Sequence, residues 1–270
     1  MKHEKADQRP ILSDIQAYRV EPIGIISTRF QQKYDAPHQS NQAIKEQATS
    51  NQATDNKQSS DRSAIIHLLP HQNFEQSLAD VQGFERVWLV YVFHENLREG
   101  QTHWKPKVLP PRGRVKRGVF ATRAPYRPNP LGISVVRVLS VQGLVLRVGD
   151  CDLLDGTPIL DIKPYIPLYD SFPDSRTGWV EELDDQPFTC KFSPEASLEL
   201  ALVANEHPTL EETLRRVLAL DPFPHPYRRI RPLDADKGLY EYAYKTWRIS
   251  YCIDQERRHI LITSLVNAAK

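Results

Sequence analysis

Short apolar runs, each bounded by polar or turn-forming residues, dominate the chain as far as residue 170. The segment Arg86–Phe93 (RVWLVYVF) is rich in β-branched and aromatic residues and is too short for a typical helix, so it predicts a buried strand. The same reasoning predicts strands at 22–28, 64–69, 86–93, 133–141, 144–148 and 157–163. Gln142-Gly143 lies between two of these ranges and predicts a tight hairpin turn.

The pattern changes beyond an acidic, turn-prone stretch at Trp179–Pro187. Ser193-Pro194 has the form of an N-cap followed by proline at the first helical position. Apolar residues then recur at helical intervals from Leu210 until Asp221-Pro222 ends the helix. A hairpin is expected after it, in which 240–253 pairs with 259–266. We therefore predict two domains, 1–185 and 186–270.

Many short strands joined by turns that contain Pro and Gly predict a mainly β fold, with a β-barrel or sandwich first and a small α+β domain after it. No strand is followed by G-x-G-x-x-G and a helix, so a Rossmann nucleotide site is not expected. The range 41–62 is polar and has no aromatic residue. Because it cannot bury much apolar surface, we predict a flexible insertion there.

Composition narrows the class of protein. The 35 Lys and Arg residues nearly balance 34 Asp and Glu, a formal charge of +1, which argues against a protein that coats nucleic acid by charge alone but allows a local basic face. Cys151, Cys190 and Cys252 form no CxxC pair, which favours a reducing compartment. The longest apolar run, Val87–Phe93, is too short to span a bilayer. We expect a cytoplasmic protein with no membrane segment.

The first segment with candidate chemistry is Gly118–Ser134 (GVFATRAPYRPNPLGIS). Its three prolines forbid a regular helix and predict a stiff loop that carries Arg123 and Arg127. Guanidinium groups suit forked binding of carboxylate or phosphate and stacking on a base. A proline-rich turn with solvated arginines is the alternative.

The second segment is Gly149–Pro167, in which Asp150, Asp152, Asp155 and Asp161 surround a turn. A divalent-metal site is one interpretation, but the spacing is not that of an EF-hand and no histidine accompanies the carboxylates, so no metal is expected. A cationic small molecule is an equally good partner. Aspartates that cap turns are the structural alternative.

The third region begins with His94-Glu95, directly after a predicted strand. The stretch Trp104–Arg117 (WKPKVLPPRGRVKR) then concentrates basic residues around a tryptophan. Basic and aromatic side chains together fit a phosphate backbone and a stacked base. A solvated basic loop is the alternative.

Two blocks, V-F-A-T-R-x-x-x-R-P-N-P-[IL]-G and D-L-x-D-G-T-P-[IV]-x-D-I-K-P-Y, resemble the TrmO family (formerly TsaA). They stand here at Val119–Gly132 and Asp152–Tyr165. Val87–His94 and Pro110-Pro111-Arg112 also fit, and the resemblance covers about 18–173, with the tail at 188–266 fitting more loosely. It implies a single-sheeted β-barrel and a homodimer. It further implies an enzyme that uses S-adenosylmethionine to methylate N6 of threonylcarbamoyladenosine beside the tRNA anticodon, at position 37.

The resemblance also implies which residues contact S-adenosylmethionine. They are Pro37, His38, Gln39, His94, Glu95, Arg123, Leu131, Gly149, Asp150, Cys151 and Asp152. His38 replaces the family's usual Arg and Glu95 its usual Gln, and both changes alter the local charge.

The stretch Asp221–Arg229 (DPFPHPYRR) resembles the family pattern D-P-R-P-x-Y, with Phe223 in place of Arg and one extra residue before Tyr227. Asp221 is the candidate to accept the N6–H hydrogen bond and its proton, and Tyr227 to stack on the base. The residues expected to bind tRNA are Lys105, Lys107, Arg112, Arg127, Arg228 and Arg229. The alternatives are a structural Asp221 and Tyr227 and, for the whole chain, a non-catalytic β-barrel that binds an adenine ligand or RNA.

Overall fold

The computed structural model describes residues 18–31, 36, 63–98, 101–183, 186–208, 210–224 and 229–268. The predicted insertion at 41–62 and five predicted site residues (Pro37, His38, Gln39, Tyr227 and Arg228) lie outside these ranges. The chain divides into two compact units. The first runs to Trp104 and resumes over Arg127–Asp170, and the second comprises Lys105–Tyr126 and the chain from Ser171 onward.

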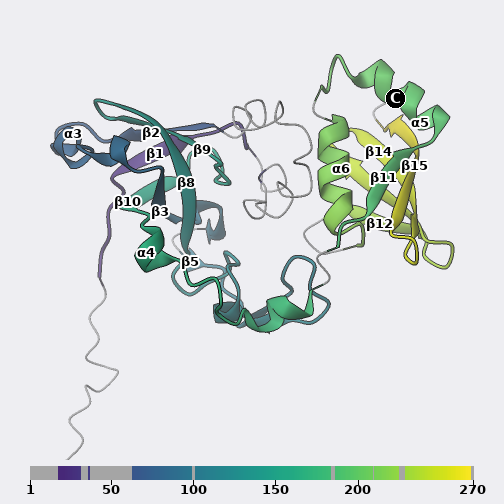
Figure 1. The fold of residues 1–270 in the computed structure, drawn as a ribbon, viewed down its shortest axis with the longest axis horizontal. Coiled ribbons are helices and arrows are strands. Elements are labelled where there is room, and N and C mark those ends of the chain that lie inside the picture. The colour runs from purple at the N-terminus through teal and green to yellow at the C-terminus, as the bar shows by residue number, and fades with distance from the viewer. Residues whose placement is uncertain are drawn as a thin grey trace, which may run out of the picture. The chain divides into compact units, whose positions relative to one another are not determined.

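Six antiparallel strands of the first unit close into one barrel, in the order β1-β10-β3-β8-β9-β2 (Figure 1). They are β1 (Gly24–Ser27), β2 (Ala64–Leu68), β3 (Arg86–Val92), β8 (Leu131–Gln142), β9 (Val145–Gly149) and β10 (Pro158–Pro164). Each falls on a predicted strand, and the single-sheeted barrel is confirmed.

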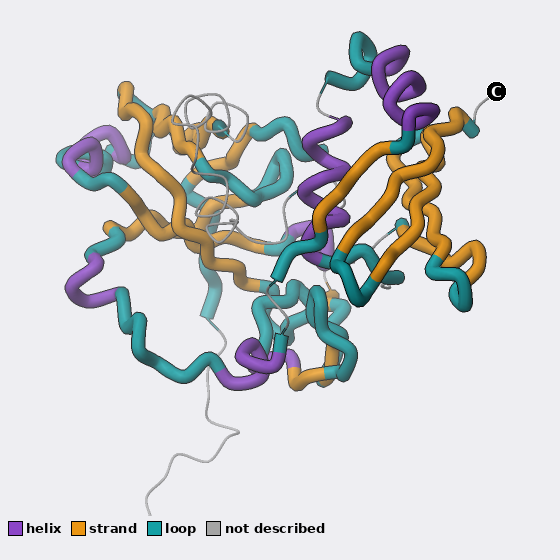
Figure 2. The backbone as a smooth tube through the Cα atoms, turned by 45° about the vertical axis from the view of Figure 1, so that its right-hand side comes forward, coloured by secondary structure: helices purple, strands orange, loops and turns teal. Residues whose placement is uncertain are grey.

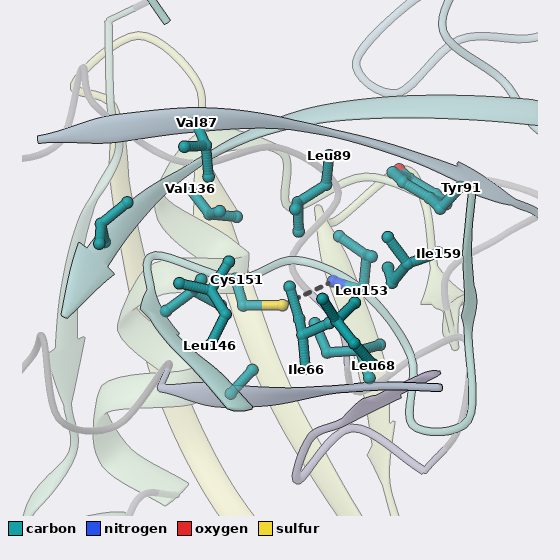
Figure 3. Close-up of a cluster of buried hydrophobic side chains, with 14 of the residues drawn as sticks. Ile66, Leu68, Val87, Leu89, Tyr91, Val136, Leu146, Cys151, Leu153 and Ile159 are labelled. Carbon is teal, nitrogen blue, oxygen red and sulfur yellow. Dashed lines mark hydrogen bonds between the residues drawn. The ribbon is translucent and has the colours of Figure 1, made fainter. Parts of the chain in front are cut away.

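Every second side chain along the strands points inward, and these apolar groups fill the barrel. Every second residue of β3 is buried, as expected for a strand with one face in a core. Leu89, Val136, Leu146 and Ile159 point inward from four different strands (Figure 3). Small barrels of this kind are filled by side chains, so ligand sites are expected at the ends of the strands.

The second unit contains a five-stranded sheet in the order β11-β15-β14-β13-β12, in which β11 runs parallel to β15. The strands are β11 (Thr189–Phe192), β12 (Ile230–Asp234), β13 (Leu239–Tyr244), β14 (Trp247–Asp254) and β15 (His259–Asn267). Figure 2 shows the helices α5 (Pro194–Val203) and α6 (Leu210–Leu220) beside these strands. The buried leucines of α6 share one core with the sheet, which confirms the predicted α+β tail.

The secondary-structure predictions for the tail are correct where the local sequence signal is strong. The Ser193 hydroxyl accepts a hydrogen bond from the Ala196 N–H at 3.1 Å, so it caps α5 as predicted. The prediction of a single strand over 240–253 is wrong, because Lys245 adopts φ 50° and turns the chain between β13 and β14. Lys-Thr is a weak turn signal, whereas the apolar pattern continues on both sides of it.

The remaining elements are short and were not predicted. They are α3 (Phe74–Ser77), η2 (Val81–Gly83), η3 (His94–Asn96), β4 (Leu97–Arg98), β5 (Gln101–Thr102), β6 (Lys107–Val108), β7 (Arg117–Gly118), η4 (Val119–Ala121), α4 (Pro167–Asp170) and η5 (Gly178–Glu182). Within the described ranges, no helix combines the length and the hydropathy needed to cross a bilayer.

Candidate functional site

Three predicted segments meet at one end of the barrel. Val92 at the end of β3 lies opposite Leu131 at the beginning of β8, and the Phe93 N–H donates to the Pro130 carbonyl at 2.7 Å. Ile159 near the beginning of β10 lies opposite Tyr91. The His94-Glu95 pair, the proline loop before β8 and the end of the aspartate loop before β10 are therefore neighbours.

His94 and Glu95 form a short turn at this end. His94 Nε2 lies 3.9 Å from Glu95 Oε1, and the Glu95 side chain is 56% exposed. Leu131 is also exposed. An accessible carboxylate and an exposed apolar side chain at the same end of the barrel suit a ligand that has both cationic and apolar parts.

Asp150 has a different environment from its neighbours. Its Oδ2 atom lies 3.3 Å from Arg86 Nη2 and 3.9 Å from Arg137 Nε. These arginines stand at the beginning of β3 and within β8, directly opposite each other in the sheet. Because both guanidinium groups offset the buried charge, the Asp150 side chain holds three strands together and is not aimed at His94, which follows the other end of β3.

The other carboxylates of this segment also have local partners. Asp155 Oδ1 accepts the Thr28 N–H at 2.9 Å, and Asp161 Oδ2 pairs with Lys163 Nζ at 2.8 Å. That hydrogen bond and charge raise the pKa of Lys163. Asp152 is half-buried. Among the residues that the structure describes, no three His, Cys, Asp or Glu side chains converge as they would around a metal ion.

Neither Cys151 nor Gly149 offers a reactive side chain at the surface of the barrel. The Cys151 side chain is fully buried in the barrel core, where Sγ accepts the Leu153 N–H at 3.4 Å (Figure 3). Any contact between Cys151 and a cofactor therefore goes through the main chain. In the second unit, burial raises the pKa of the Cys190 thiol to about 11, so that thiol is not a nucleophile near neutral pH.

Gly132, in the proline-loop block, permits a close approach. A Cβ atom built at Gly132 would lie 2.2 Å from Cε2 of the Tyr91 ring. The Tyr91 hydroxyl in turn shares a hydrogen bond with Ser134 Oγ at 3.2 Å, and the ring packs edge-on against Phe93. Because Gly132 has no side chain, β8 leaves room for the aromatic ring of Tyr91 on the neighbouring strand β3.

The basic loop, defined here as Lys105–Tyr126, belongs to the second unit and is held by its own contacts. Val119 is buried, and its carbonyl accepts the Thr122 hydroxyl at 2.8 Å. The Trp179 indole N–H donates to the Ala121 carbonyl at 2.7 Å, and Arg117 pairs with Glu182. Arg123 is exposed on this anchored loop, as a ligand-binding arginine would be.

The residues predicted to bind RNA differ in accessibility. Lys105 and Lys107 are exposed, and Lys105 Nζ lies 4.4 Å from the centre of the Tyr126 ring. Arg112 and Arg127 are half-buried, whereas Arg229 is exposed directly before β12.

Asp221 directly follows α6 and is only 2% exposed to solvent. Arg114 of the basic loop places Nη2 3.9 Å from Asp221 Oδ1, and its guanidinium lies 4.7 Å from the centre of the Phe223 ring. The fully buried Tyr251 donates its hydroxyl to the Pro222 carbonyl at 2.5 Å. The surroundings of Asp221 are therefore defined by the ion pair with Arg114 and by the hydrogen bond from Tyr251 to the next residue.

Sequence reasoning missed Arg114 and Tyr251. Arg114 is one of several basic residues in its loop, and Tyr251 reads as an ordinary core residue of a strand. No local pattern pairs either of them with residues 221–223, because the pairing arises from the tertiary fold.

A shallow pocket of about 280 Å³ lies elsewhere on the first unit. It is lined by Ser27, Thr28, Arg29, Ser63, Ala64, Ile65, Leu139 and Arg147. None of these residues belongs to the predicted site, so the pocket gives that site no support.

Comparison with known proteins identifies relatives of this chain. Residues 25–171 match the family described as tRNA-methyltransferase O N-terminal domain. The chain is 31% identical over 241 residues to the tRNA (adenine(37)-N6)-methyltransferase of Escherichia coli strain K12, covering 87% of this chain and 94% of that protein. It is 40% identical over 161 residues to a probable S-adenosyl-L-methionine-binding protein of Pyrococcus abyssi, covering 60% and 75%.

A solved structure is similar over nearly the whole chain. The crystal structure of TrmO from Pseudomonas aeruginosa superposes with a TM-score of 0.55 at 27% sequence identity, covering 93% of this chain and 99% of that one. The similarity therefore includes the tail as well as the barrel.

Proposed function

Because the chain belongs to the TrmO family, we infer that it is an S-adenosylmethionine-dependent methyltransferase that acts on N6 of an adenine in tRNA. The observation that carries this conclusion is the identity to the Escherichia coli tRNA (adenine(37)-N6)-methyltransferase, which extends over 94% of that protein and thus includes the tail with Asp221. Homodimerisation, implied by the resemblance, and a cytoplasmic location, expected from the composition, complete this proposal.

The specific acceptor that we propose is threonylcarbamoyladenosine at position 37. In that nucleoside N6 is bonded to a carbonyl group, which withdraws the lone pair of the nitrogen. A base that accepts the N6 proton therefore accelerates methylation more than it would with unmodified adenine. The threonine part also adds a carboxylate. Exposed basic side chains of the second unit, such as Lys105 and Lys107, suit that group and the tRNA phosphates.

The residues present fit S-adenosylmethionine, which has a sulfonium, an ammonium and a carboxylate. Glu95 offers an accessible negative charge at the barrel end that also carries the apolar Leu131, and Arg123 offers an exposed guanidinium. When bound, the cofactor supplies an electrophilic methyl group. His94, Asp152 and the backbone at Gly149 and Cys151 are the further contacts in this proposal. We assign the Asp150 side chain a structural role.

Asp221 supplies the acceptor chemistry in this scheme. Its carboxylate accepts the N6–H hydrogen bond, which fixes the nitrogen, and would take the proton that leaves N6 when the methyl group passes from the sulfonium to N6 and the neutral thioether departs. Tyr251 fixes the backbone of the turn through the Pro222 carbonyl. Tyr227 is proposed to stack on the base, with Arg112, Arg127, Arg228 and Arg229 on phosphates.

Replacing Arg123 by alanine should weaken S-adenosylmethionine binding at least 10-fold, because a charge-assisted hydrogen bond contributes roughly 1.5–3 kcal/mol. Isothermal titration calorimetry with the purified protein measures this directly. Arg176→Ala is the matched control, since it removes an exposed arginine of the same unit and is expected to leave the affinity unchanged. Unchanged affinity in Arg123→Ala would remove Arg123 from the cofactor site without affecting the family assignment.

A further inference from the structure

We propose that Arg114 is a positioning residue for Asp221, and that the basic loop thereby becomes part of the acceptor site. Arg114 lies between β6 and β7, far from Asp221 in the sequence. This inference rests on the role proposed above for Asp221.

The first observation is the difference in burial between the two partners. The Asp221 side chain is 2% exposed, whereas that of Arg114 is 59% exposed, and their nearest charged atoms are 3.9 Å apart. Burying a carboxylate is costly unless a cation or hydrogen-bond donors accompany it. Arg114 supplies that positive charge from a side chain that is itself accessible.

The second observation fixes the direction of the guanidinium. It lies over the Phe223 ring at 4.7 Å from the ring centre, a distance at which a cation is attracted to an aromatic face. Phe223 is itself held by edge-on contacts with Phe188 and Tyr240, at 6.0 and 6.2 Å between ring centres. The arginine thus rests on a fixed surface, and its carboxylate partner is two residues away along the chain.

The third observation is that both sides of this contact are anchored within the second unit. Tyr251, fully buried in β14, holds the Pro222 carbonyl, while Trp179 and Glu182 hold the basic loop through Ala121 and Arg117. The basic loop and the turn at Asp221 are therefore each held in place by contacts within the second unit. Phosphates that bind Lys105 or Lys107 on this loop help to fix the acceptor base against Asp221.

An exposed arginine can also act by binding a phosphate directly, and the two roles have different kinetic signatures. A phosphate contact contributes to tRNA affinity and to its salt dependence. A residue that orients Asp221 contributes to turnover, and its effect disappears once Asp221 is altered. The contact with Phe223 favours the second role, because it holds the guanidinium against the turn.

The test is a double-mutant cycle with Arg114→Gln, Asp221→Asn and the pair, measuring kcat and the KM for tRNA over a range of salt concentrations. We expect Arg114→Gln to lower kcat about 10-fold, with an unchanged salt slope of KM, since the positive charge beside the carboxylate is lost. The double variant should be as slow as Asp221→Asn alone. Arg257→Gln is the matched control, because Arg257 Nε lies 3.8 Å from Asp254 Oδ2 in an exposed turn of the same unit. It should keep the parental kcat.

Arg114→Lys retains the charge but not the planar group on Phe223, so its kcat should lie between those of the parent and Arg114→Gln. This milder change is a second test if Arg114→Gln melts at a lower temperature. A parental kcat in both Arg114 variants, with a slow Asp221→Asn, would overturn the role of Arg114 and leave the proposed function intact. Multiplicative effects with a reduced salt slope would make Arg114 a phosphate contact instead. A parental rate in Asp221→Asn would overturn both roles.

Discussion

Replacing Asp221 by asparagine is expected to lower the methylation rate about 100-fold, the lower range for loss of general-base catalysis, with an unchanged affinity for S-adenosylmethionine. Asparagine has nearly the same shape as aspartate and still accepts a hydrogen bond, but it cannot take up the proton that leaves N6. Its partner Arg114 is 59% exposed and stays hydrated without a charged neighbour, so the fold should persist.

The rate is measured in single turnover, with excess enzyme and a labelled methyl group, so that product release does not mask the chemical step. Asp254→Asn is the control, because Asp254 Oδ1 accepts the Arg257 N–H at 2.9 Å in an exposed turn of the same unit. If Asp221→Asn methylates tRNA as fast as the parent, Asp221 is structural. The group that orients the acceptor nitrogen must then be sought in the barrel loops.

Replacing Gly132 by alanine is expected to destabilise the protein by roughly 2 kcal/mol or more, within or above the usual cost of overpacking a core. The added Cβ would lie 2.2 Å from the ring of Tyr91, which packs against Phe93 and shares a hydrogen bond with Ser134. Moving the ring therefore disturbs the barrel end that carries His94 and Glu95. Both stability and cofactor affinity should fall.

Thermal unfolding followed by circular dichroism measures the first effect, and calorimetry with S-adenosylmethionine measures the second. Gly118→Ala is the matched control, because nothing lies within 4 Å of a Cβ at Gly118. Its φ of −56° also suits alanine, so its melting temperature should stay near that of the parent. An unchanged melting temperature in Gly132→Ala would show that Tyr91 has space to move and that this glycine is not required by packing.

The strands of the barrel could be predicted from the sequence because each has one buried face or a continuous apolar run. Burial in β3 alternates over its whole length, from Arg86 to Val92. Their order around the barrel could not be predicted in this way, since periodicity carries no information on which strands pair. The missed β12 shows a further limit. Pro232 and its exposed neighbours give it no apolar pattern, and it forms because β13 offers it a partner at the sheet edge.

The candidate site shows the same limit: the sequence predicts which residues belong to it, but not which partners their side chains have. His94, Glu95 and Leu131 were found from motif blocks, and the strand register brings them together. Asp150 was found by the same route, yet its carboxylate pairs with Arg86 and Arg137 on other strands. A motif gives the identity of a residue and not the partner of its side chain. The contact between Arg114 and Asp221 depends wholly on tertiary structure.

The most direct test of methyl transfer to the modified adenosine uses the purified protein, methyl-labelled S-adenosylmethionine and two preparations of one tRNA. One preparation carries threonylcarbamoyladenosine at position 37, and the other carries unmodified adenosine there. After digestion, mass spectrometry of the nucleosides locates the label. We predict N6-methylated threonylcarbamoyladenosine from the first tRNA and little labelled product from the second. Label in any other nucleoside, or tight binding of cofactor and tRNA with no transfer, would contradict the proposed reaction; the second outcome would instead indicate a non-catalytic RNA-binding barrel.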